Sequence, residues 1–506
     1  MKTFLTYVAL LLIGVGLFWF HKHSEKAAEA EAQATRMSKR VFPHGEDLDF
    51  DTLKAAVAEV RLRHPDDDAE VVITRVSDDT DDMKAWRITR PRDLPAEGNA
   101  VAGLIRSLVT LELSGEPEQS VIAGVASNEL SRFGLDAPVV TVGLRYNDGE
   151  APRMMALGAK DPTEGARYAV IEGTDDVMIV QDRETALARR LFDVRDKRVM
   201  AFEPDDVLSL TVADASGETT LRAVRAGLDA PWRLEAPVGD LADGNQITSR
   251  LNRLRGARAA TYLTEEATAE DIATFGLATP ELTVTVTKES GGARDSQRLL
   301  VGARETPNWI VMAEGATEII TVAEASLKTA TDWNENLVSR VITEFASDEL
   351  RAITWSSGES VVRLVPETDG WVCDPEPPGW RADAAEEPIA RLVGAFESLL
   401  ATSVVPLDEA QDLAALGLAS PEATIALTPA DMEREEVVLR VGSSQMRDNR
   451  EGRHISHTGR NAVFFLGSTP ASALLLDLSD LISKPEDSES VGAIASPETI
   501  STPASP

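Results

Sequence analysis

Cysteine and histidine are both scarce in this chain of 506 residues, and their scarcity removes several classes of site. The one cysteine, Cys373, excludes an intrachain disulfide framework and any zinc or iron–sulfur site built from several thiolates. Of the six histidines, His454 and His457 lie three residues apart on a predicted strand. Alternation along a strand sends side chains with odd spacing to opposite faces, so we expect surface histidines rather than metal ligands. We expect Cys373 to be a buried core residue and predict no cofactor or metal.

Positive charge is also in short supply. Lys and Arg total 50 against 84 Asp and Glu, which gives a formal net charge of −34. Such a chain repels other polyanions, so we exclude nucleic acid as a partner. The acidic runs at residues 47–51, 66–68 and 78–82 lack the glycine turn and the bidentate glutamate of a calcium loop, and we interpret them as solvated loops.

Recognised catalytic motifs are missing from the sequence. It contains no G-x-S-x-G, no H-E-x-x-H, no P-loop and no S-x-x-K beside a K-T-G box. A catalytic pair of carboxylates cannot be picked out from 84 acidic residues. The sequence favours a non-enzymatic protein, with a hydrolase that uses an unrecognised carboxylate pair as a remote alternative.

An uncharged apolar run, Phe4 to Phe20, stands at the N-terminus. As a helix it would span about 26 Å, close to the roughly 30 Å hydrocarbon core of a bilayer. Bulky and charged residues follow the run where a signal peptide needs small ones, so we expect a retained transmembrane anchor over residues 4–20. Basic residues are more numerous after the run than before it, and by the positive-inside rule this count favours a cytoplasmic body.

In place of catalytic motifs the chain has an internal repeat of roughly 140 residues. A tryptophan opens a predicted strand in each copy, a Gly-Leu-x-x-Pro motif follows it, and a Leu-Gly or Val-Gly pair comes next. The shared motif residues are Trp86, Gly134, Leu135 and Pro138, then Trp232, Gly276, Leu277 and Pro280, then Trp371, Gly417, Leu418 and Pro421. We divide the chain into a membrane-proximal tether (21–56), repeat units 57–200, 201–343 and 344–483, and a disordered Pro/Ser-rich tail (484–506).

Each unit has the pattern of an α+β fold, an antiparallel sheet packed with a few helices. Two alternating strands precede the Trp-led strand, and a Pro-containing loop leads into an amphipathic helix, clearest at Ile389, Leu392, Val393, Phe396, Leu399 and Leu400. A short acidic helix then ends at the motif glycine, further strands follow, and the first unit closes with a helix over residues 183–192. A left-handed helix end requires glycine.

We interpret the repeated tryptophans as core packing rather than as a platform for sugar rings. Four other tryptophans are not shared by all units and are better candidates for a unit-specific ligand surface: Trp309, Trp333, Trp355 and Trp380.

The order of these motifs resembles the bacterial family catalogued as domain of unknown function 4340. The resemblance covers about residues 57–483, together with the N-terminal run and Arg40-Val41-Phe42-Pro43. It implies an anchored protein of the bacterial inner membrane with a periplasmic body, from a family often encoded beside ABC transporter components of the gliding-motility type. The family has no established catalytic residues. This chain departs from it in its acidity and in His454, which stands where Tyr168 and Trp309 head a strand.

The resemblance and the missing motifs together predict a non-enzymatic scaffold or accessory subunit of a membrane complex of the ABC transporter type. Its partners would be the membrane, through Phe4 to Phe20, and other proteins of that complex. The alternative is an envelope module that binds glycan or peptide.

Overall fold

The computed structural model describes residues 34–35, 37–44, 49–67, 69–77, 85–162, 165–368 and 370–482. The expected anchor, the start of the tether and the tail lie outside these residues. Within them, no helix combines the length and the apolar character that crossing a bilayer requires. The chain forms two compact units, which divide between Lys197 and Arg198.

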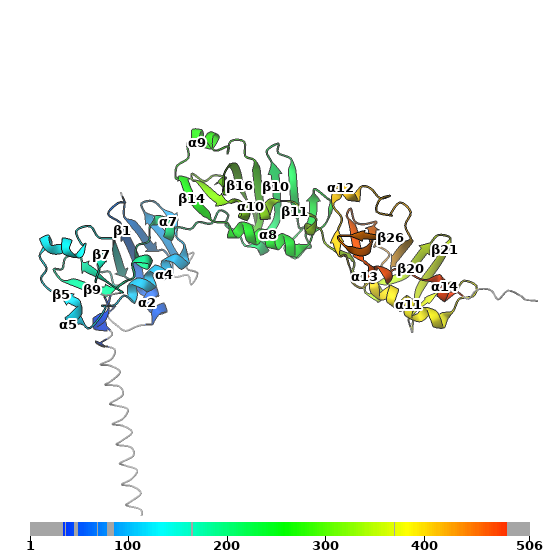
Figure 1. The fold of residues 1–506 in the computed structure, drawn as a ribbon, viewed down its shortest axis with the longest axis horizontal. Coiled ribbons are helices and arrows are strands. Elements are labelled where there is room, and N and C mark those ends of the chain that lie inside the picture. The colour runs from blue at the N-terminus through cyan, green and yellow to red at the C-terminus, as the bar shows by residue number, and fades with distance from the viewer. Residues whose placement is uncertain are drawn as a thin grey trace, which may run out of the picture. The chain divides into compact units, whose positions relative to one another are not determined.

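The first unit is built on one antiparallel sheet (Figure 1). In the described residues its strand order is β4-β3-β2-β1-β6-β7-β8-β9-β5. The strands are β1 Val57–Arg63, β2 Val71–Arg75, β3 Trp86–Arg90, β4 Leu94–Pro95, β5 Val121–Ile122, β6 Val140–Tyr146, β7 Arg153–Lys160, β8 Ala166–Ile171 and β9 Val177–Gln181. The helices are α2 Phe50–Ala56, α4 Gly98–Val109, α5 Pro117–Ser120, η1 Ser127–Phe133, α6 Glu184–Leu187 and α7 Leu191–Val194.

The second unit contains two further sheets. The first has the order β13-β12-β11-β10-β15-β16-β17-β18-β14, and the other has the order β22-β21-β20-β25-β26-β27-β28-β24. Their strands are β10 Val207–Asp214, β11 Thr219–Val224, β12 Arg233–Ala236, β13 Asp240–Leu241, β14 Ala259–Thr264, β15 Leu282–Ser290, β16 Ala293–Glu305, β17 Asn308–Ala313, β18 Ile319–Ala323, β20 Leu350–Ser357, β21 Ser360–Glu367, β22 Gly370–Cys373, β24 Ser403–Val404, β25 Ala423–Pro429, β26 Val437–Arg447, β27 Arg450–His457 and β28 Val463–Gly467.

Helices and a two-stranded ladder complete the second unit. The ladder joins β19 Val341–Thr343 to β23 Leu399–Leu400. Helices α8 Gly244–Gly256 and α10 Glu324–Thr331 pack together beside the sheet that contains β10 (Figure 1). The other helices are α9 Ala269–Thr274, α11 Ala382–Ala395, α12 Leu407–Ala410, α13 Ser468–Ser472 and α14 Leu478–Leu481, with short 3-10 turns η2 Pro204–Asp206, η3 Glu335–Leu337 and η4 Ser347–Glu349.

The predicted fold class is confirmed as α+β with mostly antiparallel sheets. The three sheets repeat one strand order, except that the third has no counterpart of β4 and β13 among the described residues. Alternation explains the strands: along β25 every second side chain is buried. Helical periodicity explains α4, whose buried Val101, Leu104, Ile105 and Leu108 form one face.

Two predicted helices are wrong in extent. The amphipathic helix of the third repeat ends at Ala395, and Leu399 and Leu400 form strand β23 instead. Leu399 is 2% exposed and Leu400 is 52% exposed. This alternation belongs to a strand, but in sequence it continues the apolar spacing of a helix. The helix expected over 183–192 is split into α6 and α7.

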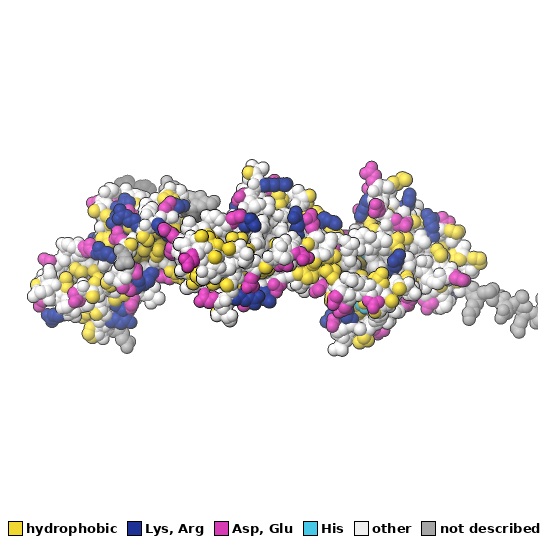
Figure 2. All heavy atoms as spheres, turned by 90° about the horizontal axis from the view of Figure 1, so that it is seen from above, with side chains coloured by type: hydrophobic (Ala, Val, Ile, Leu, Met, Phe, Trp, Pro, Cys, Tyr) yellow, Lys and Arg dark blue, Asp and Glu magenta, His cyan; other side chains and the backbone are white. Residues whose placement is uncertain are grey.

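Each of the two compact units has its own main hydrophobic core. The first unit has its own main cluster around Trp86, Leu104 and Val142. In the second unit one continuous cluster joins both large sheets, from Leu210 and Leu251 to Leu392 and Phe464. On the face of the molecule in Figure 2, Asp and Glu side chains are interspersed with Lys and Arg.

Asp240 on β13 links the two sheets of the second unit. Its carboxylate accepts hydrogen bonds from Arg460 Nε, from the backbone N–H groups of Asn461 and Ala462, and from its neighbour Leu241 N–H. The Asp240 side chain is fully buried, with 0% exposure. Repeats two and three are therefore joined by apolar contact and by one buried ion pair.

Candidate functional site

The Gly-Leu motif ends a short helix in the first two repeats and a run of turns in the third. Gly134, Gly276 and Gly417 have φ angles of +66°, +72° and +70°. The N–H of the following leucine donates to the carbonyl five residues before it, as in Leu135 to Leu130. This is the Schellman arrangement, which requires a residue in the left-handed region. In the third repeat α12 ends earlier, at Ala410, and turns continue to Gly417.

The second glycine of each repeat packs against this helix end. A Cβ on Gly158 would lie 2.4 Å from the carbonyl oxygen of Phe133. The corresponding distances are 2.3 Å for Gly302 and 2.7 Å for Gly442. No side chain fits at such distances, so the two glycine motifs recur together because one backbone passes directly over the other.

The remaining motif residues have structural surroundings as well. Leu135, Leu277 and Leu418 are buried in small clusters separate from the main cores. The prolines that follow, Pro138, Pro280 and Pro421, are half-buried. The Gly-Leu motif and the repeated tryptophans therefore lie in different clusters and do not form one site.

The repeated tryptophans differ in their surroundings. Trp86 and Trp232 are core residues, 1% and 7% exposed. Each has an arginine over its ring: Arg75 Cζ lies 5.2 Å from the centroid of Trp86, and Arg225 Cζ lies 4.9 Å from that of Trp232. Trp371 also packs against the main core of the second unit, but it is only half-buried and its exposed part lines a cavity, so the core interpretation holds only in part for the third repeat.

Of the four unshared tryptophans, Trp380 lines the same cavity. Trp309 is buried beneath Arg304, whose Cζ lies 4.2 Å from the ring centroid, and buried Trp355 donates its Nε1–H to Leu474 O at 3.0 Å. Trp333 packs against the main core of the second unit. Of these candidates for a unit-specific ligand surface, Trp309 and Trp355 are therefore buried side chains, and Trp380 lines the groove.

The histidine prediction is also corrected. His454 is 3% exposed and its ring centroid lies 5.3 Å from that of Phe465, so it is not a surface residue. Burial lowers its pKa, with Arg447 adding to the effect. His457 is half-buried, and its Nδ1 accepts the Gly459 N–H. Among the described residues no group of three or more His, Cys, Asp or Glu is placed to hold a metal ion.

Strand register shows which residue His454 replaces. Ala169, Val311 and Ile455 occupy the same register position in their sheets, so His454 corresponds to Tyr168 and to Ile310 rather than to Trp309. Trp309 corresponds instead to Arg167 and Arg453. Each of these arginines donates to the carbonyl oxygen of the second motif glycine, Gly158 or Gly442.

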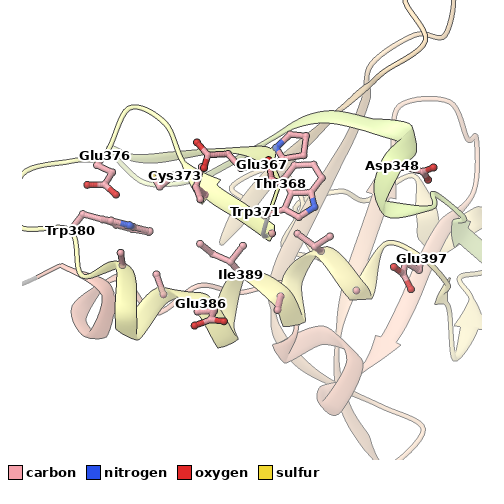
Figure 3. A pocket seen from close by; sticks show the side chains of 18 residues that line it. Asp348, Glu367, Thr368, Trp371, Cys373, Glu376, Trp380, Glu386, Ile389 and Glu397 are labelled. Carbon is pink, nitrogen blue, oxygen red and sulfur yellow. The ribbon is translucent and has the colours of Figure 1, made fainter.

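The cavity is a groove of about 810 Å³ in the third repeat, between the β21–β22 hairpin and α11. Figure 3 shows Trp380 towards one end of the groove and Trp371 nearer its middle, with Cys373 and Ile389 between the two indoles. Asp348 and Glu397 lie beyond Trp371, towards the other end. Its wall on the helix side is formed by small and aliphatic side chains of α11, including Ala385, Ile389 and Val393. The groove thus has an apolar floor with two indoles along its length.

Charge around the groove has one sign. Five carboxylates line it, and no lysine or arginine does: Asp348, Glu367, Glu376, Glu386 and Glu397. All five are exposed. A concave apolar surface that carries several carboxylates attracts cationic groups. Cys373 is buried, which raises the pKa of its thiol, so it is not set up as a nucleophile.

The sheet edge above the groove is open. β22 is the last strand of its sheet, whereas the equivalent strands β3 and β12 are each followed by a further short strand, β4 or β13. None of the described residues forms a strand on the outer side of β22. Sequence reasoning missed this site, although aligning the three repeats would have shown Pro377-Pro378-Gly379 where β4 and β13 stand.

These features define a class of protein, a tandem-repeat α+β protein. In every copy the two glycine motifs pack against each other, and the third copy has an open groove beside its edge strand. The chain belongs to the family described as "Domain of unknown function (DUF4340)", whose model matches residues 86–229, 232–387 and 375–496. The predicted family is thereby confirmed. The first two matches begin at the tryptophan of the Trp-led strand and run through the first two strands of the next sheet. The third begins just after β22 and runs past the last strand, β28. Neither the curated proteins nor the solved structures gave a match.

Proposed function

We propose that this protein is a non-enzymatic, membrane-anchored scaffold, an accessory subunit of a membrane complex of the ABC transporter type. The observation that carries the proposal is the difference among the repeats. Two of them cover the edge of the Trp-led strand with their own chain, and the third leaves the edge open above an apolar groove lined with carboxylates. An open edge beside a groove is a common way to bind another protein.

The anchor and the location belong to the same proposal. Residues 4–20 hold the chain in the bacterial inner membrane, and the body lies on the periplasmic side. The count of basic residues around the run opposes this orientation. Alkaline phosphatase fused to the C-terminus measures the orientation directly, because the enzyme is active only outside the cytoplasm. An inactive fusion that is expressed at normal levels contradicts the periplasmic placement.

Co-purification tests the scaffold role. The full-length chain and a version that lacks residues 1–26 are crosslinked in membranes, solubilised and affinity-purified. We expect permease and ATPase subunits with the full-length chain and much weaker recovery without the anchor. If neither version recovers a membrane protein, the accessory-subunit role is wrong.

A second candidate, an envelope module that binds glycan or peptide, is favoured by the groove itself. Trp371 and Trp380 provide two flat apolar faces close to carboxylates, and such faces suit sugar rings as well as side chains. If this candidate is right, the full-length protein and a version that lacks residues 1–26 bind the same glycans on an array. The Trp371→Ala variant of the full-length protein does not bind them.

A further inference from the structure

The first two repeats fill the place that the third leaves open. In sheet one β4 pairs with β3 through Arg87↔Pro95 and Ile88↔Leu94. In the next sheet β13 pairs with β12 through Arg233↔Leu241 and Leu234↔Asp240. The corresponding residues of β22, counted from the tryptophan that opens each stretch, are Val372 and Cys373.

A turn explains why the third repeat has no such strand. The spacing from the proline after the Trp-led strand to the residue before the helix is the same in all three repeats: Pro91 to Glu97, Pro237 to Asp243 and Pro375 to Arg381. Pro378 and Gly379 therefore occupy the positions that β4 and β13 occupy in the other repeats. Here the Trp380 N–H donates to Pro377 O at 3.0 Å, and Gly379 has a φ of +81°. The chain turns away from β22, and Pro377 and Pro378 have no N–H to offer a strand.

Besides the edge strand, the third repeat lacks the arginine that lies over the repeated tryptophan in the first two repeats. In the first repeat Arg75 lies directly opposite Trp86 on the neighbouring strand. In the second repeat Val224 lies opposite Arg233, so the next residue, Arg225, is the one opposite Trp232. In the third repeat that place, opposite Trp371, belongs to Pro366. Among the described residues, no lysine or arginine lies over Trp371. The repeat that lacks its own arginine is the one whose groove is lined with carboxylates.

We propose that the groove binds an extended, basic segment of a partner protein. The segment adds as a short antiparallel strand beside Val372 and Cys373 and lays one lysine or arginine side chain over Trp371. This inference rests on the proposed scaffold role, since it identifies how the partner docks. The partner would supply in trans both parts that the first two repeats supply themselves.

Charge and geometry support this occupant. Side chains of a strand alternate, so when one points into the groove its second neighbour does too and can reach the Trp380 end. The carboxylates of Glu367, Glu376 and Glu386 would neutralise such cations. The chain's own tail fits poorly, because residues 484–506 carry four carboxylates and one lysine. A second copy of the chain is disfavoured by its net charge of −34.

Peptide binding to the full-length protein in detergent tests the inference. The probe is a fluorescein-labelled hexapeptide that alternates arginine with valine, blocked at the other end and followed by fluorescence anisotropy. One control peptide replaces arginine with glutamate, and a second keeps arginine but carries N-methyl groups on alternate amides. We expect each control to bind at least about tenfold more weakly, because one loses the charge and the other loses the ladder hydrogen bonds.

Protein variants locate the binding. The double variant Glu367→Gln, Glu386→Gln should weaken binding of the arginine peptide about tenfold. The matched control, Glu433→Gln with Glu435→Gln, removes two exposed carboxylates outside the groove and should change nothing. Pro366→Arg restores the arginine of the other repeats and should also weaken binding, because its own side chain then occupies the face of Trp371. Thermal unfolding checks that each variant is folded.

Several outcomes overturn the inference. Equal affinity for the N-methylated peptide excludes strand addition, and equal effects of the groove and control variants exclude the groove. Glycan binding that depends on Trp371, with no peptide binding, favours the second candidate function instead. Co-purification that is unchanged in the groove variant overturns the docking mode and leaves the scaffold role intact. Peptide binding without any co-purified membrane protein overturns the transporter role alone.

Discussion

Two glycines in each repeat are fixed by one close approach of the backbone. Gly134 takes a left-handed conformation at the helix end, and Gly158 passes under the carbonyl of Phe133. The first requirement is conformational and the second is steric, so the two positions resist substitution for different reasons.

Replacing Gly158 with alanine should lower the free energy of unfolding by about 2 kcal/mol, because the new Cβ cannot fit beneath the Phe133 carbonyl. The matched control is Gly103→Ala on the exposed side of α4, where nothing lies within 4 Å of the new Cβ. That change should raise stability by up to about 1 kcal/mol, since alanine is the better helix former. Urea unfolding measures both. Equal losses would show that the contact at Gly158 is not limiting.

His454 makes a prediction about acid stability. Its folded pKa lies below the ordinary value of 6.5, so the unfolded chain binds the proton more readily than the folded chain. Stability is therefore complete above the unfolded pKa and is lost as the pH falls from there towards the folded pKa. His457 is shifted in the same direction, again mainly by burial, and adds to the loss.

The His454→Phe variant should keep the packing against Phe465 and lose part of this pH dependence. Denaturant unfolding between about pH 7 and pH 5 measures it, with the slope at about pH 8 as the reference that should not change. The same acid sensitivity in parent and variant would mean that the His454 ring is not kept neutral by its surroundings.

Among the elements, strand β13 makes two structural contacts. It covers the edge of β12, and through Asp240 it holds the Asn461 and Ala462 backbone of the third repeat. Pro378 stands at the same place in the third repeat and does neither. A two-residue element therefore supplies the buried ion pair between the second and third repeats, and its absence from the third repeat leaves the edge of β22 open.

Asp240→Asn should lower the free energy of unfolding of the second unit by about 3 kcal/mol. The amide places an NH₂ group where the carboxylate accepts N–H donors, and it leaves Arg460 buried without its counter-ion. The control is Glu235→Gln, which breaks the ion pair of Glu235 with Arg222, both about half exposed. This change should alter the free energy of unfolding by less than about 1 kcal/mol. Similar effects of both changes in chemical denaturation would show that burial of the Asp240 pair adds nothing.

On the scale of the whole molecule, the described residues of the three repeats form two main cores. The first repeat has its own cluster, whereas one cluster joins the sheets of the second and third. Cooperative unfolding follows continuous cores. The repeat count of the sequence therefore does not give the number of cooperative units.

Calorimetry of the full-length protein in detergent should show two transitions. Gly158→Ala should lower one of them, and Asp240→Asn should lower the other, because the two residues belong to different cores. Hydrogen exchange assigns each transition to residues before or after 198. A third independent transition, or a shift of both transitions by either variant, would contradict this division.

The sequence by itself determined the repeat, the fold class and the family, because a glycine that must be left-handed and strands that alternate leave local marks at fixed spacing. It also placed most of the early strands of each unit close to their observed bounds. It failed where one local pattern serves two structures, as at Leu399 and Leu400.

Only the tertiary structure decided the groove, the open edge and the surroundings of each tryptophan. Trp86, Trp232 and Trp371 head strands of the same kind, yet only the first two are buried, and Trp371 keeps an exposed part in the groove, because what covers a side chain comes from other elements. The loss of an arginine and of a two-residue strand is too small to register in composition or periodicity. It matters because both losses fall on the same edge of one sheet.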